Sequence, residues 1–316
     1  MRYALMIEPQ QGCSYDDQLA IARRAETAGF EALFRADHYD SFPGEGGRPT
    51  TDAWTVLAGL ARETERIRLG VLVSPVTFRH PGNLAKIVAT VDEMSGGRVV
   101  VGLGAGWNEG EHAHHGFAFP PIDVRAEMLE EQLAILRGLW QEPDGWSFAG
   151  RHYTVPGSLF RPRPVQRPAP QVIVGGEGSP RSMRIAVRFA DEFNLSSSTP
   201  ERAAERFAKL DETARAAGRD PSSLVHSAMV GVLVGRDAAE VERRTGVLLE
   251  QFGLADAGTG WLETRRPRWV VGTPDEARAM ARRFAAAGVQ RLMLQDFLPW
   301  DLDMIDLMGE VLLTSA

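Results

Sequence analysis

Asp37 and His38 form the adjacent pair of side chains best suited to chemistry, and they stand at the end of a predicted strand, 32–37. Histidine changes its charge near neutral pH and therefore suits proton transfer. A lone histidine is often only a hydrogen-bonded structural residue, but its position at a strand end favours a functional role. Glu8 ends the first predicted strand, and its carboxyl group could be a second acid or base or only a loop cap.

A segment of small residues, Gly104–Asn108, follows the buried run of the fourth predicted strand. Ala105 and Gly106 carry little or no side chain, so backbone amides there can approach a ligand closely. Trp107 lies in the same segment and could form a wall for a cofactor or a substrate, or could simply pack. Its position in a loop favours the wall.

A second glycine-rich segment, Gly175–Ser179, has the sequence GGEGS and precedes Pro180, a residue favoured at the first position of a helix. Free backbone amides and the helix dipole favour a phosphate at such a place. The glycines Gly175, Gly176 and Gly178 could equally serve only the path of the chain. The residues by themselves leave both interpretations open.

Three histidines close in sequence, His112, His114 and His115, raise the question of a metal site. The spacing of His112 and His115 could place both on one helical face. However, no H-E-x-x-H pattern occurs, and no carboxylate is paired with them at helical spacing. We therefore interpret the segment as a polar loop and expect no metal. The single cysteine, Cys13, excludes an intramolecular disulfide bond and a cysteine metal cage.

The composition is that of an ordinary globular enzyme, with 316 residues of which 44% are hydrophobic and 24% charged. A net charge of −7 without any basic cluster argues against nucleic acid as a partner. No apolar run approaches the roughly 20 residues that span a bilayer, and the N-terminus does not resemble a signal peptide. We expect a cytoplasmic protein that acts on a small molecule, with no membrane partner.

Signals for strands and helices alternate along the chain, which indicates βαβ units and a parallel sheet. Strands are predicted at 3–8, 32–37, 67–74, 99–103, 172–174, 192–196, 225–234 and 291–295. Helices are predicted at 15–29, 52–64, 81–94, 125–140, 180–189, 200–217, 238–252, 274–287 and 302–313.

Eight such units fit a (β/α)8 barrel, or TIM barrel, built as a single domain over residues 1–316. A doubly wound open sheet is the alternative, but no early G-x-G-x-x-G follows the first strand. Two insertions interrupt the alternation: a hairpin with a proline-rich connector near 141–170, and an irregular segment near 253–271. Active sites of such barrels lie at the C-terminal strand ends, so the residues singled out above should share one mouth.

Several blocks of this sequence carry a resemblance that covers nearly the whole chain. They include ALFRADHYD at 32–40, TERIRLGVLVSPVTFRHPGNLAK at 64–86, SGGRVVVGLGAGWNEGEHAHHG at 95–116 and PQVIVGGEGSPRSMRIAVRFADEFN at 170–194. In this order they resemble the bacterial luciferase-like superfamily, and within it the oxidoreductases that depend on the deazaflavin coenzyme F420. Enzymes that use flavin mononucleotide (FMN) share these blocks.

The resemblance implies a (β/α)8 barrel with insertions, usually a homodimer, that holds a cofactor ring across its mouth. The bond between Leu72 and Val73 would match a non-prolyl cis peptide bond that supports the ring. Gly175 and Gly176 would bind the cofactor phosphate. With the strand-end residues, the expected cofactor-binding set is Asp37, His38, Leu72, Val73, Ser74, Ala105, Gly106, Trp107, Asn108, Gly175, Gly176, Gly178 and Ser179.

The activity implied by the resemblance is hydride transfer between C5 of coenzyme F420 and a C=C, C=N or alcohol/carbonyl group of a small substrate. His38 would be the general acid or base, Asp37 would orient it or the ring, and Glu8 could assist. An FMN-dependent monooxygenase is the alternative, and a barrel that carries the cofactor without turnover is a third. Trp107 stands where sugar-phosphate dehydrogenases of the family carry a glutamate, which argues against a sugar-phosphate substrate.

Overall fold

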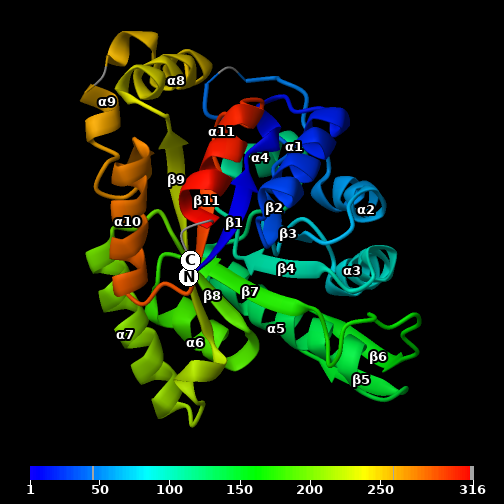
Figure 1. Cartoon of the computed structure of the whole chain (residues 1–316). Coiled ribbons are helices and arrows are strands. Elements are labelled where there is room, and N and C mark those ends of the chain that lie inside the picture. Colours follow the sequence, from blue (N-terminus) through cyan, green and yellow to red (C-terminus); the bar gives the residue numbers. More distant parts are fainter. Residues whose placement is uncertain (45, 259, 314–316) are drawn as a thin grey trace.

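The computed structural model describes residues 1–44, 46–258 and 260–313. Within these residues, eight parallel strands close into a barrel, as the sequence predicts, because β11 pairs with both β1 and β9 (Figure 1). In order around the barrel, the strands are β1 (Arg2–Ile7), β2 (Ala32–Arg35), β3 (Arg68–Pro75), β4 (Val99–Gly104), β7 (Gln171–Gly176), β8 (Glu192–Ser196), β9 (Val225–Val234) and β11 (Arg291–Asp296).

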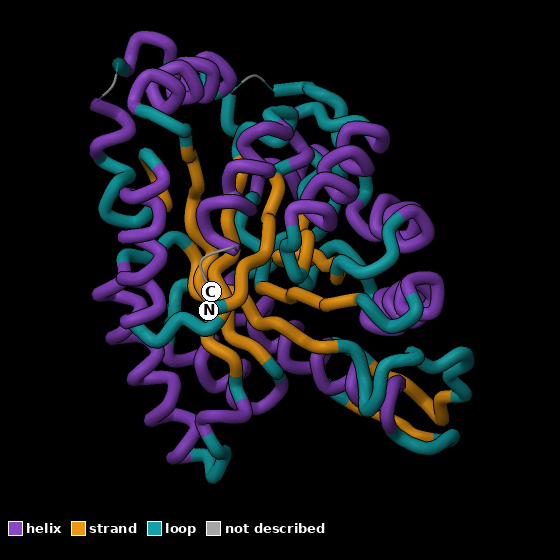
Figure 2. The backbone as a smooth tube through the Cα atoms, viewed as in Figure 1, coloured by secondary structure: helices purple, strands orange, loops and turns teal. Residues whose placement is uncertain are grey.

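Helices surround the strands and cover the outer face of the barrel (Figure 2). The helix α1, for example, is preceded by Ser14, which forms a capping box with Asp17, and is followed by Gly29, which has a φ of 95°. The helices are α1 (Tyr15–Ala28), α2 (Ala53–Glu63), α3 (Pro81–Ser95), α4 (Glu109–His114), α5 (Ile122–Gln141), α6 (Pro180–Phe189), α7 (Pro200–Ala216), α8 (Ala238–Gln251), α9 (Gly260–Glu263), α10 (Pro274–Ala286) and α11 (Leu302–Met308).

The core has two layers because successive side chains of a strand point to opposite faces. Along β1, Ala4 and Met6 belong to a cluster inside the barrel, whereas Leu5 and Ile7 pack in the larger cluster against the helices. Inside the barrel, the ring of Phe34 lies where a side chain at position 70 would be. A Cβ on that glycine would come within 2.6 Å of the ring, so a glycine is required there.

The strands β5 (Trp146–Ala149) and β6 (Thr154–Ser158) form an antiparallel hairpin at the position where the sequence predicts one. This hairpin projects away from the barrel in Figure 1. Its base is fixed because the ring of Trp146 lies over Gly138 of α5, where a Cβ would come within 2.1 Å of the ring. The connector that follows is fixed to α3, since the carboxylate of Asp92 accepts hydrogen bonds from the amides of residues 165 and 166.

Two segments differ from the sequence prediction. The predicted irregular insertion near 253–271 contains α9 and ends in a short strand, β10 (Val270–Gly272), which pairs with the last residues of β9, on the same side as β8 and beyond the end of β8. An apolar run this short among arginines gives little strand signal. Thr259, within that insertion, lies outside the described residues. The predicted polar loop at 109–115 is instead the six-residue helix α4.

No helix in the described ranges combines the length and the apolar character needed to cross a membrane.

Candidate active site

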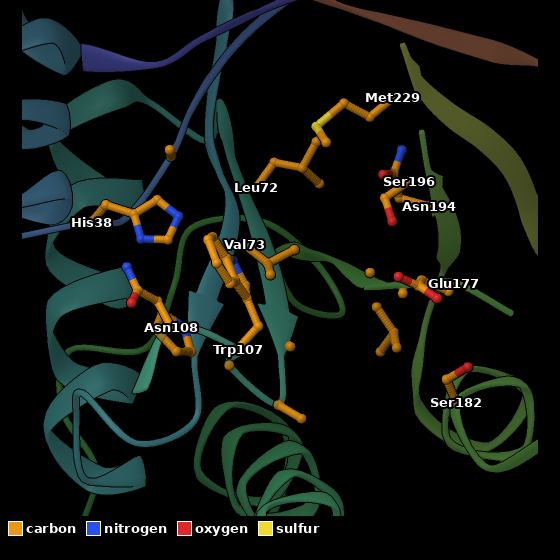
Figure 3. Close-up of a pocket in the computed structure, with 18 of the residues that line it drawn as sticks. His38, Leu72, Val73, Trp107, Asn108, Glu177, Ser182, Asn194, Ser196 and Met229 are labelled. Atoms are coloured by element: carbon orange, nitrogen blue, oxygen red, sulfur yellow. The ribbon is translucent and has the colours of Figure 1, made fainter. Parts of the chain in front are cut away.

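A cavity of about 700 Å³ lies at the C-terminal ends of the barrel strands, within the usual size range of small-molecule sites (Figure 3). It brings together residues that are far apart in the sequence. Of the residues singled out from the sequence, those that line it are Glu8, His38, Leu72, Val73, Ala105, Gly106, Trp107, Asn108, Gly175, Gly176 and Ser179. Asp37, Ser74 and Gly178 lie outside the set of lining residues.

His38 faces the cavity and is held by Glu111, a residue that the sequence analysis did not identify. Its Nδ1 lies 3.0 Å from a carboxylate oxygen of Glu111, whose side chain is buried. The other oxygen of Glu111 accepts hydrogen bonds from the backbone amides of Tyr39 and Asp40. An ionised carboxylate can only accept hydrogen bonds, so Nδ1 of His38 carries a proton and Nε2 can exchange a proton with a bound molecule.

The carboxylate of Glu111 is stabilised in its ionised form. Burial alone would raise its pKa, but the hydrogen bonds from His38 and from the two backbone amides outweigh burial and lower the pKa below the ordinary value. Glu111 comes from the helix α4. The N-cap of this helix is Asn108, and its side chain accepts a hydrogen bond from the backbone amide of Glu111. The short helix therefore positions the partner of His38.

The carboxylate of Asp37 is bound by residues other than His38, so of the two roles expected for it, orienting His38 or the cofactor ring, the first belongs to Glu111. Its carboxylate is buried and accepts hydrogen bonds from Ser74 at 2.7 Å and from Arg79 at 2.5 Å. Arg79 also pairs with Asp52, at the start of α2. Asp37 and Ser74 thus belong to a buried ion-pair network behind the cavity wall, and the partner that orients His38 is Glu111.

Val73 shapes the floor of the cavity. The peptide bond between Leu72 and Val73 is cis, which is the bond that the resemblance implied. The side chain of Val73 fills the space in front of two glycines, since a Cβ on Gly104 or on Gly175 would come within 2.7 or 2.8 Å of it. Gly175 therefore makes room for the side chain of Val73. A Cβ placed on the adjacent Gly176 would make only ordinary van der Waals contact with Ser182.

Glu8 is nearly buried at the end of β1 and lines the cavity. Its carboxylate accepts hydrogen bonds from the side-chain amides of Gln10, at 2.7 Å, and Gln295. Gln295 lies near the end of β11, so this carboxylate is fixed by two different strand ends. The position allows Glu8 to hydrogen-bond a molecule in the barrel mouth.

Of the three histidines near residue 112, His112 has other partners than His114 and His115. His112 is buried, with its ring nitrogens 2.6 Å from the Asn108 carbonyl and 2.6 Å from the Thr77 hydroxyl. His114 and His115 both contact Asp40 at the surface. In the part of the chain that the structure describes, no group of three or more histidine, cysteine or acidic side chains is arranged to hold a metal ion.

The far side of the cavity from His38 is formed by the start of α6 (Figure 3). Ser179 caps this helix, since its hydroxyl accepts a hydrogen bond from the amide of Ser182 at 3.2 Å. Arg181 lines the cavity in the first turn. The helix N-terminus and a guanidinium group favour an anion at this end. Gly178 has a φ of 78°, so this glycine serves the turn itself.

A family model described as luciferase-like monooxygenase matches residues 1–296. The chain belongs to this family. Among curated luciferase-like relatives, an uncharacterized Mycobacterium tuberculosis protein is 34% identical over 187 residues, which cover 54% of this chain and 64% of that protein. The matched segment thus spans less than two thirds of the length of this relative.

Two further luciferase-like relatives have names that state a cofactor. The F420-dependent glucose-6-phosphate dehydrogenase of Microbacterium testaceum is 30% identical over 86% of this chain and 84% of its own length. The FMNH2-dependent dimethylsulfone monooxygenase of Pseudomonas putida is 29% identical over 79% of this chain and 66% of its own length. A solved F420-dependent secondary alcohol dehydrogenase, 23% identical, has the same fold, with a TM-score of 0.84 over 100% of this chain and 99% of its own.

Proposed function

We propose that this protein is an oxidoreductase that uses coenzyme F420 to transfer a hydride to or from a small organic substrate. The proposal rests on the position of His38, which lines the cavity while its Nδ1 is hydrogen-bonded to the buried carboxylate of Glu111. Reduction of a C=O or C=N group, or oxidation of an alcohol, moves one proton together with the hydride. A histidine oriented by a carboxylate supplies or removes such a proton. The deazaflavin, when bound, supplies the carbon that gives or accepts the hydride.

The shape and chemistry of the cavity fit a flavin or deazaflavin. Its volume of about 700 Å³ accommodates a tricyclic ring and part of the side chain. The start of α6, with Gly176, Ser179 and Arg181, offers backbone amides, a hydroxyl and a guanidinium group to a phosphate. The ring would lie between this end and His38, against Val73 and the Gly104–Asn108 segment.

Within this arrangement, the residues of the chain have distinct roles. His38 would exchange a proton with the reacting oxygen or nitrogen of the substrate through Nε2. Glu111 would keep the imidazole in one orientation, with Nδ1 bound to its carboxylate. Glu8, fixed by Gln10 and Gln295 at the end of the neighbouring strand β1, would accept a hydrogen bond from a hydroxyl or N–H group of the substrate.

Hydride transfer with reduced F420 tests the proposal. The purified protein is incubated with reduced F420 and a panel of ketones, imines and enones, and the absorbance of oxidised F420 is followed. We expect one substrate class to restore this absorbance. His38→Gln should lower turnover by about 100-fold even at saturating F420, whereas the surface variant His114→Gln should behave as the wild type. Equal turnover in His38→Gln and wild type would contradict the role of this residue.

An FMN-dependent monooxygenase is the second candidate, and similarity to the FMNH2-dependent dimethylsulfone monooxygenase favours it. Reduced FMN reacts with oxygen, whereas the deazaflavin does so poorly. Measuring oxygen uptake with reduced FMN, in parallel with the F420 assay, separates the two candidates. Substrate-dependent oxygen uptake without any F420 turnover would select the monooxygenase.

A further inference from the structure

We infer that the substrate is a neutral molecule with an apolar or aromatic body and a single hydroxyl or carbonyl group, and that Phe42 and Trp107 select it. This inference rests on the proposed function, because it assumes that the reacting group of the substrate lies at His38.

Two aromatic rings stand against the imidazole of His38. The ring of Phe42 lies 4.6 Å from it at an angle of 81°, and the ring of Trp107 lies 5.7 Å from it at 74°. The two rings also contact each other, with centroids 5.4 Å apart. Phe42 comes from the segment after β2 and Trp107 from the segment after β4, so two loops converge beside His38. A molecule that reaches Nε2 of His38 therefore lies against these rings.

The apolar surface beside His38 is exposed. Trp107 is 64% exposed and Ile122 is 56% exposed, and both line the cavity. Such large apolar side chains at a concave site lose unfavourable contact with water when an apolar molecule covers them. Phe297 adds another ring to the lining. The wall is thus suited to an alkyl or aromatic body rather than to a polyhydroxylated one, which would need hydrogen-bonding partners in place of water.

The charges in the cavity argue against an anionic substrate. Among the described residues that line it, Arg181 is the sole arginine or lysine. Its guanidinium group lies at the start of α6, the end of the cavity far from His38, where the proposed function places the cofactor phosphate. The side of the cavity near His38 carries the carboxylates of Glu8 and Glu111 instead. A phosphate or carboxylate on the substrate would meet these negative charges there without a cation to balance it.

A matched pair of probes tests the inference: cyclohexanone, which is neutral, and cyclohexanecarboxylate, which has a similar body and a negative charge. Dissociation constants are measured by ligand-observed NMR for protein without cofactor and for protein mixed with oxidised F420. We expect cyclohexanone to bind at least about tenfold more tightly than the carboxylate.

The variants Phe42→Ala and Trp107→Ala identify the residues responsible. Each should weaken cyclohexanone binding by about fivefold or more, because each removes an aromatic face from the wall. Trp300→Ala removes a tryptophan that is 43% exposed and lies outside the cavity lining, so it should leave the dissociation constant unchanged. The thermal unfolding of each variant is measured to check that it is folded, so that the dissociation constants compared are those of folded proteins.

The outcomes separate this inference from the proposed function. Equal or tighter binding of the carboxylate, or cyclohexanone binding that neither Phe42→Ala nor Trp107→Ala weakens, would overturn the inference. The proposed function is judged on the same samples by F420 fluorescence. Selective cyclohexanone binding without any quenching of F420 fluorescence would reject F420 as the cofactor and leave the neutral, apolar site supported.

Discussion

His38 is presented to the cavity by a carboxylate from the short helix α4. The bond between His38 and Glu111 spans 73 positions of sequence, and the same carboxylate ties down the backbone of the segment after β2. One side chain therefore fixes both the histidine ring and the backbone that carries it.

The variant Glu111→Gln tests this arrangement. It keeps the size of the side chain but removes the negative charge that faces Nδ1 and that accepts two backbone hydrogen bonds. We expect the turnover number to fall by about tenfold or more with cofactor affinity little changed, since the proton-transfer group loses its orientation. Steady-state kinetics with F420 measure it, and Glu109→Gln, an exposed acid on the same helix, is the matched control. Unchanged turnover in Glu111→Gln would contradict the role of the carboxylate.

At this scale the sequence identifies residues at strand ends but not their partners. His38, Glu8 and Trp107 could be predicted to line the mouth, because strand ends follow from the apolar pattern. The partners Glu111 and Arg79 could not be predicted, since contacts between distant loops leave no periodic signal in one sequence. Asp37 stands beside His38 in the sequence, yet adjacent side chains of an extended chain point to opposite sides.

At the scale of elements, Arg79 joins the segments behind the cavity wall. It pairs with Asp37 after β2 and with Asp52 at the start of α2, and the hydroxyl of Tyr39 donates to Asp52 at 2.7 Å. Burial alone would raise the pKa of Asp52, but the charge of Arg79 and hydrogen bonds lower it to about 2. The network therefore connects the segments that follow β2 and β3 to the start of α2.

The variant Asp52→Asn measures the electrostatic part of this network. Asparagine is as good an N-cap as aspartate, so the start of α2 is kept. Because the pKa of Asp52 is lower in the folded protein than in the unfolded chain, its ionised carboxylate stabilises the folded state. This stabilisation is complete above about pH 4 and is lost as the pH falls towards 2. Because Asp52 is one third exposed, we expect a loss of about 1 kcal/mol at pH 7.

Urea unfolding at pH 7, 4 and 3 checks this expectation. The difference in unfolding free energy between wild type and Asp52→Asn should narrow as the pH falls below about 4. Asp16→Asn, an exposed acid in the first turn of α1, should show no such trend. A difference that is constant across the pH range would exclude an ionic contribution of Asp52.

Gly102 allows β3 and β4 to approach where their register shifts. A Cβ at this position would come within 2.1 Å of the carbonyl oxygen of Val71, which is backbone and cannot rotate away. We expect Gly102→Ala to lower the unfolding free energy by about 2 kcal/mol or more.

In α8, Gly246 has open space at its Cβ, so Gly246→Ala should stabilise the protein by about 0.5 to 1 kcal/mol. Chemical denaturation measures both, and a neutral Gly102→Ala would contradict the tight contact.

At the scale of the whole molecule, the sequence predicts the barrel because each strand and helix has its own apolar period. The eight barrel strands follow that pattern, and the barrel closes when the last of them, β11, pairs with the first. The short elements β10 and α4 escape prediction, since three and six residues are too few to show a period. The homodimer implied by the resemblance stays a prediction, to be measured by light scattering after size-exclusion chromatography.

The most direct test of F420 as the cofactor is a titration of the purified protein with F420 and with FMN side by side, read by quenching of cofactor fluorescence. We expect saturable binding of F420 at micromolar concentration, at least about tenfold tighter than FMN. Saturable binding of FMN with no quenching of F420 over the same range would contradict it.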